Sequence, residues 1–253
     1  MDAPVLYHIQ ISHYNEKARW ALDYKRIPHL RRAPPPMMHS VWALAMTRGT
    51  TFPVLALNGE RIGDSTRIIE ALEQRYPEPP LYPSDPEDRR RALELEEFFD
   101  EELGPHIRRA VFAEVTRDPV SFAQAAAPRA GRVEHLIYRT TATAAAPILR
   151  LRYGINPDTA ELGRQKTRAA LDRVSAEVQP SGYLVGERFS VADLTAAALL
   201  MPIVWPEEAE YLPRGPWPAP VHRWRDSVSD HPAFDWVSDM YKRHRGSSAE
   251  VAA

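Results

Sequence analysis

The chain has 253 residues, of which 44% are hydrophobic and 26% charged, and its formal net charge is −2. This length suits one large or two small globular domains, and the nearly balanced charge provides no field that would draw the protein to nucleic acid or to an anionic membrane. The sequence contains no cysteine, which excludes disulfides, thiolate metal sites and covalent thiol chemistry by the protein itself.

Two further features bear on location. No apolar run reaches the roughly 18 residues that a membrane span requires. Residues 1–10 lack a basic region followed by an apolar core, which is the pattern of a secretory signal. We therefore expect a cytoplasmic protein with neither a membrane nor a nucleic acid as a partner.

The first eighty residues predict alternating strands and helices. Apolar and polar residues alternate over 5–11, as in a strand, and the spacing over 15–24 is helical. A short second strand is predicted over 29–32 and a short helix over 37–46.

The segment from Thr51 to Tyr76 gives the clearest local signal. An apolar run at 54–57 predicts a strand, Asn58 and Gly59 predict a tight hairpin turn, and the chain returns as a second strand through Gly63. Ser65 is predicted to be the N-cap of a helix whose apolar residues follow at helical spacing.

The same segment predicts a ligand. Pro53 cannot donate to the strand ladder, which leaves neighbouring backbone groups free to pair with something extended. The helix start at Asp64 and Ser65 offers free N–H groups, a hydroxyl and the positive end of the helix dipole, all of which suit a carboxylate. Together they indicate a small zwitterionic peptide.

The second half of the chain predicts helices alone. Four prolines between Glu78 and Glu87 mark a linker, and helical patterns follow over 88–112, weakened at Gly104, and over 159–178. Ser190 and Asp193 form a capping box at the start of a further helix. Residues 246–253 are predicted to be a disordered tail.

Four segments together resemble the glutathione transferase family. They are the pair Phe52-Pro53, the pair Asp64-Ser65, the stretch SHYNEKARWAL at 12–22, and YLVGERFSVADLTAAALL at 183–200. Residues 110–165 match nothing known to us. The resemblance implies an α/β domain of thioredoxin-like fold at 1–80, a linker at 81–87 and an all-helical C-terminal domain at 88–245. It also implies a homodimer, with glutathione as co-substrate and no further cofactor.

The resemblance assigns the glutathione-binding residues. Backbone at Phe52, beside a cis Pro53, would pair with the cysteinyl unit, while Asp64 and Ser65 would hold the γ-glutamyl end. Arg48 could meet the glycyl carboxylate, since a guanidinium fork matches a carboxylate. His39 is a second candidate for that role.

The thiol needs a group that lowers its pKa, such as a hydroxyl at the start of the first helix. Alignment with the serine and cysteine branches of the family puts Ser12 in that place, followed by His13 where those branches have proline. Tyr7, Tyr14 and Asn15 are alternatives, and it also stays open that no residue activates the thiol.

A second substrate would bind between the domains, with Tyr14 as one contact. If 88–112 stays helical, one helix face carries an aromatic ring and several polar groups that would suit an aromatic or anionic electrophile. These residues are Phe99, Glu102, His106 and Arg109. Core packing or simple exposure would explain them equally well.

The sequence thus predicts a glutathione transferase, in the family's role of detoxification, that attacks a small electrophile with a bound thiolate. It does not separate conjugation from isomerisation, dehalogenation or peroxide reduction. Two alternatives stay open: a non-catalytic ligand-binding or scaffold protein of the same fold, and a transferase for another small thiol. The nine histidines lack metal-ligand spacing, and neither a phosphate-binding glycine loop nor a hydrolase serine turn occurs, so no metal is expected.

Overall fold

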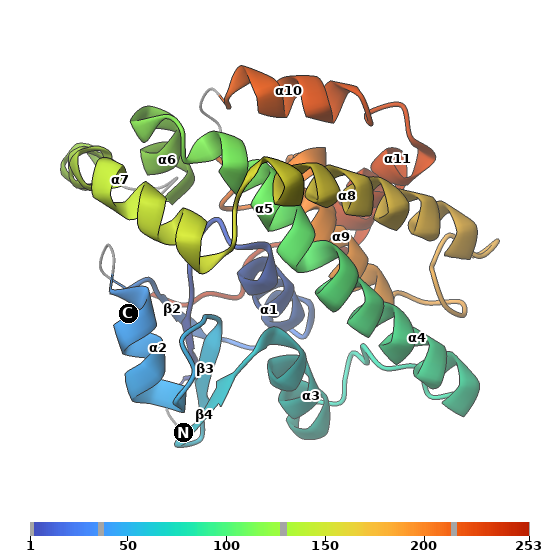
Figure 1. Cartoon of the computed structure of the whole chain (residues 1–253). Coiled ribbons are helices and arrows are strands. Elements are labelled where there is room, and N and C mark those ends of the chain that lie inside the picture. The colour runs from blue at the N-terminus through green and yellow to red at the C-terminus, as the bar shows by residue number, and fades with distance from the viewer. Residues whose placement is uncertain (1–2, 35–37, 127–130, 214–216, 253) are drawn as a thin grey trace.

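A four-stranded mixed sheet forms the centre of the N-terminal domain in the computed structural model, which describes residues 3–34, 38–126, 131–213 and 217–252 (Figure 1). The strand order is β2-β1-β3-β4, with β1 parallel to β2 and the other neighbours antiparallel. The strands are β1 (Val5–Tyr7), β2 (Leu30–Arg32), β3 (Val54–Leu57) and β4 (Glu60–Gly63), and the helices of this domain are α1 (His13–Tyr24), α2 (His39–Thr47) and α3 (Ser65–Arg75). This is the thioredoxin-like arrangement predicted from the sequence, although the first strand is shorter than expected and Met37 lies outside the described residues.

The C-terminal domain is all helical in its described residues, as predicted. Its first long helix begins at Pro86, two residues before the predicted start, because the Asp85 carboxylate caps it. The helical elements are α4 (Pro86–Phe98), a π-helical turn η1 (Phe99–Leu103), α5 (Gly104–Val115), α6 (Pro119–Ala126), α7 (Arg132–Arg152), α8 (Pro157–Glu177), α9 (Val191–Val204), α10 (Ala219–Asp226) and α11 (Pro232–His244). None of the helices in the described ranges is long and apolar enough to cross a membrane.

Helices α1 and α9 form the core that joins the two domains. Every residue of α9 is buried, and its start carries the predicted capping box, in which Asp193 accepts hydrogen bonds from the N–H and the hydroxyl of Ser190 at 2.8 and 2.9 Å. Trp20 of α1 is fully buried and stacks on Phe189, with ring centroids 5.7 Å apart. The domains therefore share one hydrophobic core rather than meeting at a polar interface.

The predicted continuous helix over 88–112 is interrupted. The π-turn η1 fits an extra residue into one turn, so the side chains of α5 are rotated relative to those of α4. The Tyr14 hydroxyl donates to the carbonyl oxygen of Asp100 in this turn at 2.5 Å. A Cβ at Gly104 would lie 2.0 Å from that hydroxyl, so only glycine fits where α1 approaches the start of α5.

The region around 110–165, which the sequence left unassigned, forms α6, α7 and the start of α8. Helix α8 packs on α5, where a Cβ at Gly163 would lie 2.4 Å from the carbonyl oxygen of His106. Helices α6 and α7 pack on each other as a hairpin. Arg152 at the end of α7 donates to the carbonyl oxygen of Thr50 at 3.1 Å, which ties this hairpin to the N-terminal domain.

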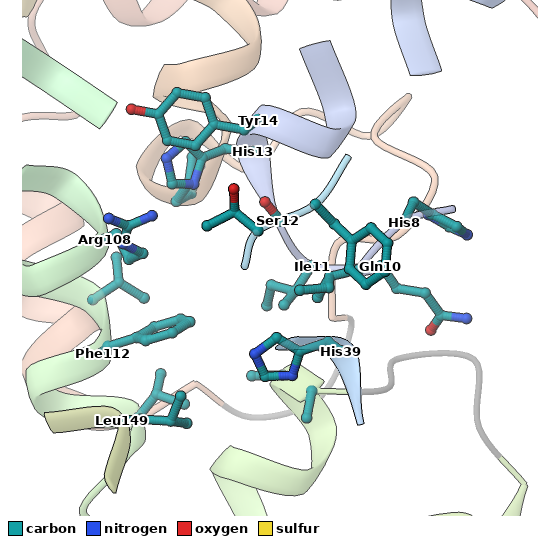
Figure 2. Close-up of a pocket in the computed structure, with 18 of the residues that line it drawn as sticks. His8, Gln10, Ile11, Ser12, His13, Tyr14, His39, Arg108, Phe112 and Leu149 are labelled. Carbon is teal, nitrogen blue, oxygen red and sulfur yellow. The ribbon is translucent and has the colours of Figure 1, made fainter. Parts of the chain in front are cut away.

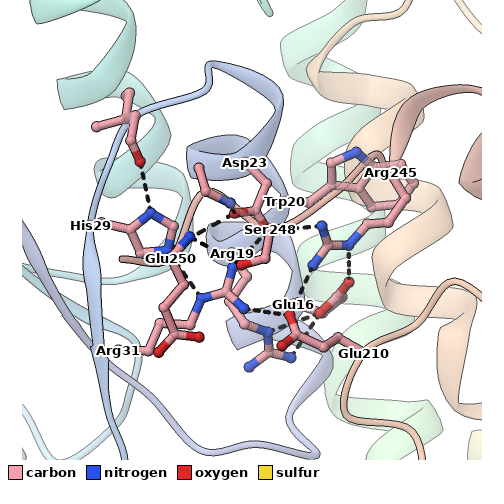
Figure 3. A network of polar contacts seen from close by, with 12 residues as sticks. Glu16, Arg19, Trp20, Asp23, His29, Arg31, Glu210, Arg245, Ser248 and Glu250 are labelled. Carbon is pink, nitrogen blue, oxygen red and sulfur yellow. Dashed lines mark hydrogen bonds and ion pairs between the residues drawn. The ribbon is translucent and has the colours of Figure 1, made fainter. Parts of the chain in front are cut away.

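A buried ionic network lies beneath the sheet edge at β2 (Figure 3). Arg245 contacts Glu16 at 2.6 Å and Asp23 at 2.8 Å, and both carboxylates are almost fully buried. Arg31 contacts the same Asp23 at 2.6 Å and Glu210 at 2.5 Å. Burial opposes the charge on Glu16, but Arg245 and Arg19 outweigh it and lower its pKa to about 2. The Glu16 carboxylate thus stays charged inside the protein.

The C-terminal tail is ordered by this network, which differs from the disordered tail predicted over 246–253. The Ala249 N–H donates to Asp23 at 2.8 Å, and the Val251 N–H donates to the carbonyl oxygen of His29 at 2.9 Å. Residues 246–252 therefore lie beside the chain just before β2, while Ala253 is outside the described residues. A short polar sequence gave no signal of these partners, because they come from α1 and β2.

We expect Arg245→Met to destabilise the protein by about 3–5 kcal/mol, because it leaves Glu16 buried with less compensation. Arg243→Met is the matched control at the same end of α11. Arg243 is 39% exposed and its ion-pair partner Asp239 is 54% exposed, so the loss of folding free energy should stay within about 1 kcal/mol. Urea unfolding of both variants measures the difference. Equal destabilisation of the two would show that the network contributes no more than a surface pair.

Candidate functional site

A cavity of about 720 Å³ lies between the two domains. One wall consists of the β1–α1 loop, the loop before β3 and the start of α3. The opposite wall comes from α5, α6, α7 and α9. Figure 2 shows Ser12 facing this space, with Arg108 and Phe112 of α5 on one side and His39 on another.

Ser12 is the N-cap residue of α1, but its hydroxyl does not cap the helix. Its carbonyl oxygen accepts the N–H of Glu16 at 2.9 Å, and its side chain makes no capping hydrogen bond among the described residues. The side chain is half-buried and lines the cavity. A free hydroxyl and the positive end of a helix dipole therefore meet at one point of the cavity wall.

Asn15 holds the loop that carries Pro53. Its Oδ1 accepts the N–H of Ile9 at 3.0 Å, and its Nδ2 donates to the carbonyl oxygen of Phe52 at 3.2 Å. Asn15 is fully buried and does not line the cavity. The Phe52–Pro53 peptide bond is cis, as the resemblance implied, and both residues line the cavity.

The start of α3 differs from the prediction by one residue. Asp64, not Ser65, is the N-cap, and its Oδ1 accepts the N–H groups of Thr66 and Arg67 at 3.0 and 3.2 Å. Asp64 has a φ of 76°, a left-handed value that is uncommon outside glycine. Ser65 is the first helical residue and is 2% exposed; both residues line the cavity. The free N–H at the helix start belongs to Ser65.

A buried lysine that the sequence analysis missed supports this helix start. Lys17 of α1 contacts the hydroxyl of Thr66 at 2.8 Å, the carboxylate of Glu96 at 2.8 Å and that of Asp100 at 2.6 Å. Burial disfavours its charge, but Asp100 and Glu96 outweigh this and raise its pKa. A lysine on the buried side of an otherwise apolar helix pattern was the signal that could have found it.

The other candidates for thiol activation are engaged elsewhere or lie off the cavity. Tyr14 lines the cavity, but its hydroxyl donates a hydrogen bond to the Asp100 carbonyl, and burial raises the pKa of Tyr14 well above its ordinary value. Tyr7 packs edge-on against Trp42 of α2, with ring centroids 6.4 Å apart, and is not among the lining residues.

The two candidates for the glycyl carboxylate differ in position. Arg48 is exposed at the C-cap of α2, with a left-handed φ of 61°, and does not line the cavity. His39 at the start of α2 does line it. Burial, and then the charge of Arg152, lower the pKa of His39, which keeps its ring neutral at physiological pH.

The predicted second-substrate face does not line the cavity. Phe99 is fully buried in the core, and His106 and Arg109 lie outside the lining, where the Nε of Arg109 donates to the carbonyl oxygen of Tyr153 at 3.0 Å. The helical spacing that linked these residues assumed an uninterrupted helix, and the π-turn breaks it. The residues of α5 and its C-terminal end that line the cavity are Arg108, Val111, Phe112, Val115 and Thr116.

The rest of the second wall is apolar, and most of it comes from the segment that the sequence left unassigned. Residues of α6 and α7 line the cavity next to α5, and residues of α9 and the chain after it complete the wall. They are Phe122, Ala125, Ala126, Tyr138, Leu149, Met201, Leu212 and Trp217. The cavity therefore has a polar half from the N-terminal domain and an apolar half from the helices. Within the described ranges, no group of three or more His, Asp or Glu side chains could hold a metal ion.

Comparison with known proteins agrees with this fold. Residues 6–80 match the family profile of the glutathione S-transferase N-terminal domain, and residues 141–232 match that of the glutathione S-transferase C-terminal domain. The chain belongs to the glutathione S-transferase family. The family resemblance drawn from the sequence is thus confirmed. Between the two matched segments of this transferase-family chain lie α4, α5 and α6, of which α5 and α6 supply much of the apolar half of the cavity.

Three relatives illustrate the range of similarity. FtsZ-localized protein A of Caulobacter vibrioides is 25% identical over 242 residues, which cover 90% of this chain and 88% of the relative. A glutathione S-transferase of Rhodospirillum rubrum F11 is 23% identical, with a TM-score of 0.57 over 92% of this chain and 91% of that one. A glutathione S-transferase of Methylobacterium radiotolerans, solved with glutathione sulfonate, is 20% identical, with a TM-score of 0.56 over 92% and 93% of the two chains. At these identities the two transferase structures show a shared fold.

His13, which replaces the proline of the serine branches, joins the two walls of the cavity. Its Nε2 lies 3.0 Å from the carbonyl oxygen of Gly104, so this nitrogen carries the proton of a neutral ring. Burial, and then the charge of Arg108, lower the pKa of His13 to about 3. The ring therefore stays uncharged when the protein is folded at neutral or mildly acidic pH.

This shift predicts a loss of stability in mild acid. Below the unfolded pKa of about 6.5, the unfolded chain binds a proton at His13 that the folded protein does not, so stability falls as the pH decreases. Between pH 7 and pH 5 this should lower the free energy of unfolding by about 2 kcal/mol. His13→Gln keeps a donor for Gly104 and should lose less stability over the same range. Equal losses for the two proteins in urea unfolding at both pH values would contradict the assignment.

Proposed function

We propose that this family member binds glutathione in the polar half of the cavity and uses its thiolate to attack an electrophile held in the apolar half. The observation that carries the proposal is the Ser12 hydroxyl, which lies at a helix N-terminus, faces the cavity and makes no capping bond among the described residues. It shares that wall with Phe52 and Ser65, the positions the family uses for the thiol and the γ-glutamyl group.

The polar half provides complementary groups for a zwitterionic tripeptide. The N–H and hydroxyl of Ser65 at the start of α3 suit the γ-glutamyl carboxylate. Both capping bonds of Asp64 go to Oδ1, so Oδ2 is available to accept from the ammonium group. The backbone of Phe52 would pair with the cysteinyl unit. For the glycyl carboxylate, His39 fits better than Arg48, because only His39 lines the cavity.

The chemistry requires a thiolate. A free thiol has a pKa of about 8.5, and a hydrogen bond from a hydroxyl together with a helix N-terminus lowers that value. In this proposal the thiol releases its proton to solvent, Ser12 donates to the sulfur, and the N-terminus of α1 stabilises the negative charge. The sulfur then forms a bond to the electrophilic carbon, and the leaving group departs with the electron pair of its former bond.

A second candidate function is partner binding without catalysis. It is favoured by the relative named FtsZ-localized protein A, which shares 25% identity over nearly the whole of both chains. A protein of that kind would keep the fold without needing Ser12 to act on a thiol. Use of another small thiol and assembly as a homodimer, both implied by the family, belong to the same set of proposals.

Glutathione binding should raise the thermal unfolding midpoint. If the affinity is about 0.1 mM, about 10 mM glutathione adds roughly 2.7 kcal/mol to the stability of the folded state. For a chain of this size the midpoint should rise by about 5–10 °C. Ser65→Ala should reduce the shift, while Ser84→Ala in the linker serves as the control. A wild-type protein whose midpoint does not move with glutathione would refute the glutathione site.

Ser12→Ala should raise the pKa of bound glutathione and lower kcat about a hundredfold, the typical effect of removing one donor to a developing anion. Glutathione affinity should change little, because the carboxylates and the backbone carry it. Ultraviolet absorbance of the thiolate against pH gives the pKa, and Ser12→Thr is the matched control that keeps a hydroxyl. Unaltered thiolate formation in Ser12→Ala would favour the non-catalytic alternative.

A further inference from the structure

Among the described residues that line the cavity, Arg108 is the one lysine or arginine. It is half-buried on α5 and lies next to Phe112 on the wall opposite Ser12 (Figure 2). In the part of the chain that the structure describes, its buried Nε has no hydrogen-bond partner, and no carboxylate is close enough for an ion pair. Its guanidinium carbon lies 4.4 Å from the centre of the Tyr153 ring, a cation–π contact.

Among the described residues, the three arginines that are almost fully buried are all paired with carboxylates. Arg19, Arg31 and Arg245 each contact a carboxylate in the network beneath β2. The neighbouring Arg109 donates to a backbone carbonyl, as does Arg150 at the end of α7. Leaving a buried donor of a charged group without a partner is costly, because it gives up hydration without gaining a hydrogen bond. Arg108 therefore has a binding capacity that the protein itself does not use.

The surroundings of Arg108 restrict what could use it. On its own helix Val111 and Phe112 continue the cavity wall, and Leu149 of α7 lies beyond them. The adjacent His13 is neutral and already donates to the Gly104 carbonyl. A ligand that reaches Arg108 must therefore combine an apolar, preferably aromatic, body with an anionic group.

We propose that the second substrate is an aromatic electrophile that carries a carboxylate, which Arg108 holds while the ring lies against Phe112 and the apolar wall. This inference rests on the proposed function, since it names the substrate class of the same cavity. A guanidinium offers two parallel donors that match the two oxygens of a carboxylate, and the half-buried setting reduces screening by salt. Arg108 is then a specificity-determining residue rather than part of the thiol-activating machinery.

The test compares a chloronitrobenzoate with the carboxamide of the same ring, which has a similar shape and no charge. Isothermal titration gives the affinity of each compound for the protein loaded with S-methylglutathione, whose capped sulfur cannot attack the ring. We expect the benzoate to bind about ten- to a hundredfold more tightly than the carboxamide, the usual contribution of a hydrogen-bonded charged pair. In Arg108→Gln the preference should shrink to less than about threefold, with the glutathione-induced thermal shift retained.

Two further variants control for folding and for net charge. Arg108→Lys keeps the positive charge but lacks the two parallel N–H donors of the guanidinium, and it should retain part of the preference for the benzoate. Arg168→Gln removes the same charge from α8, where the side chain is 55% exposed, and should keep the full preference. Equal affinities of the two compounds for the wild-type protein would overturn the proposal, as would a preference that survives in Arg108→Gln.

Other outcomes separate this inference from the proposed function. If Arg108→Gln weakens the binding of the benzoate and of the carboxamide equally and raises the pKa of bound glutathione, Arg108 acts on the thiolate and the proposal fails. If the variant loses the glutathione-induced thermal shift, Arg108 binds a carboxylate of glutathione and the proposal also fails. If the wild-type protein shows no glutathione shift, the titrations are run without glutathione. An Arg108-dependent preference for the benzoate then supports the anion site while the proposed function falls.

Discussion

The burial of charged side chains on α1 is the constraint on which the rest of the structure depends. Glu16, Lys17, Arg19 and Asp23 are almost completely removed from solvent, and a buried charge is tolerated only when it is paired and hydrogen-bonded. Three of them find partners on other elements: Lys17 on α3, α4 and the π-turn, Asp23 on β2 and the C-terminal tail, and Glu16 on Arg245. Arg19 pairs with Glu16 within α1. The buried charges of α1 thereby hold elements of both domains and the C-terminal tail against this one helix.

The same helix sets the geometry of the cavity. Its N-terminus presents Ser12, its first turn places Asn15 under the Phe52 carbonyl, and Tyr14 and His13 reach across to the π-turn and to Gly104. Because the bonds of Tyr14 and His13 use the main-chain carbonyls of Asp100 and Gly104, they depend on where the π-turn lies rather than on particular side chains. The π-turn in turn decides which residues of α5 face the cavity, and so it brings Arg108 rather than Arg109 to the wall.

The two halves of the cavity differ in origin and in chemistry. The polar half consists of short loops and helix starts of the thioredoxin-like domain, whose free N–H groups and hydroxyls suit a zwitterionic peptide. The apolar half comes mostly from α5, α6 and α7, and the described part of this largely apolar wall carries one guanidinium, that of Arg108. In the proposed mechanism the first half fixes the nucleophile and the second selects the electrophile, so substrate choice depends on the part of the chain between and around the matched family segments.

Local signals in the sequence determined the fold class, the hairpin at Asn58-Gly59, the capping box at Ser190 and the positions of Ser12, Pro53, Asp64 and Ser65. Each of these rests on neighbouring residues in the chain, which propensity and capping rules describe well. Tertiary structure alone decided the π-turn, the ordered tail and the buried pairs of Lys17 and Arg245. It also decided that Arg108, rather than the predicted Arg109, lines the cavity. These depend on partners tens to hundreds of residues away, and the energy of a buried charge is set by those partners rather than by its neighbours in sequence.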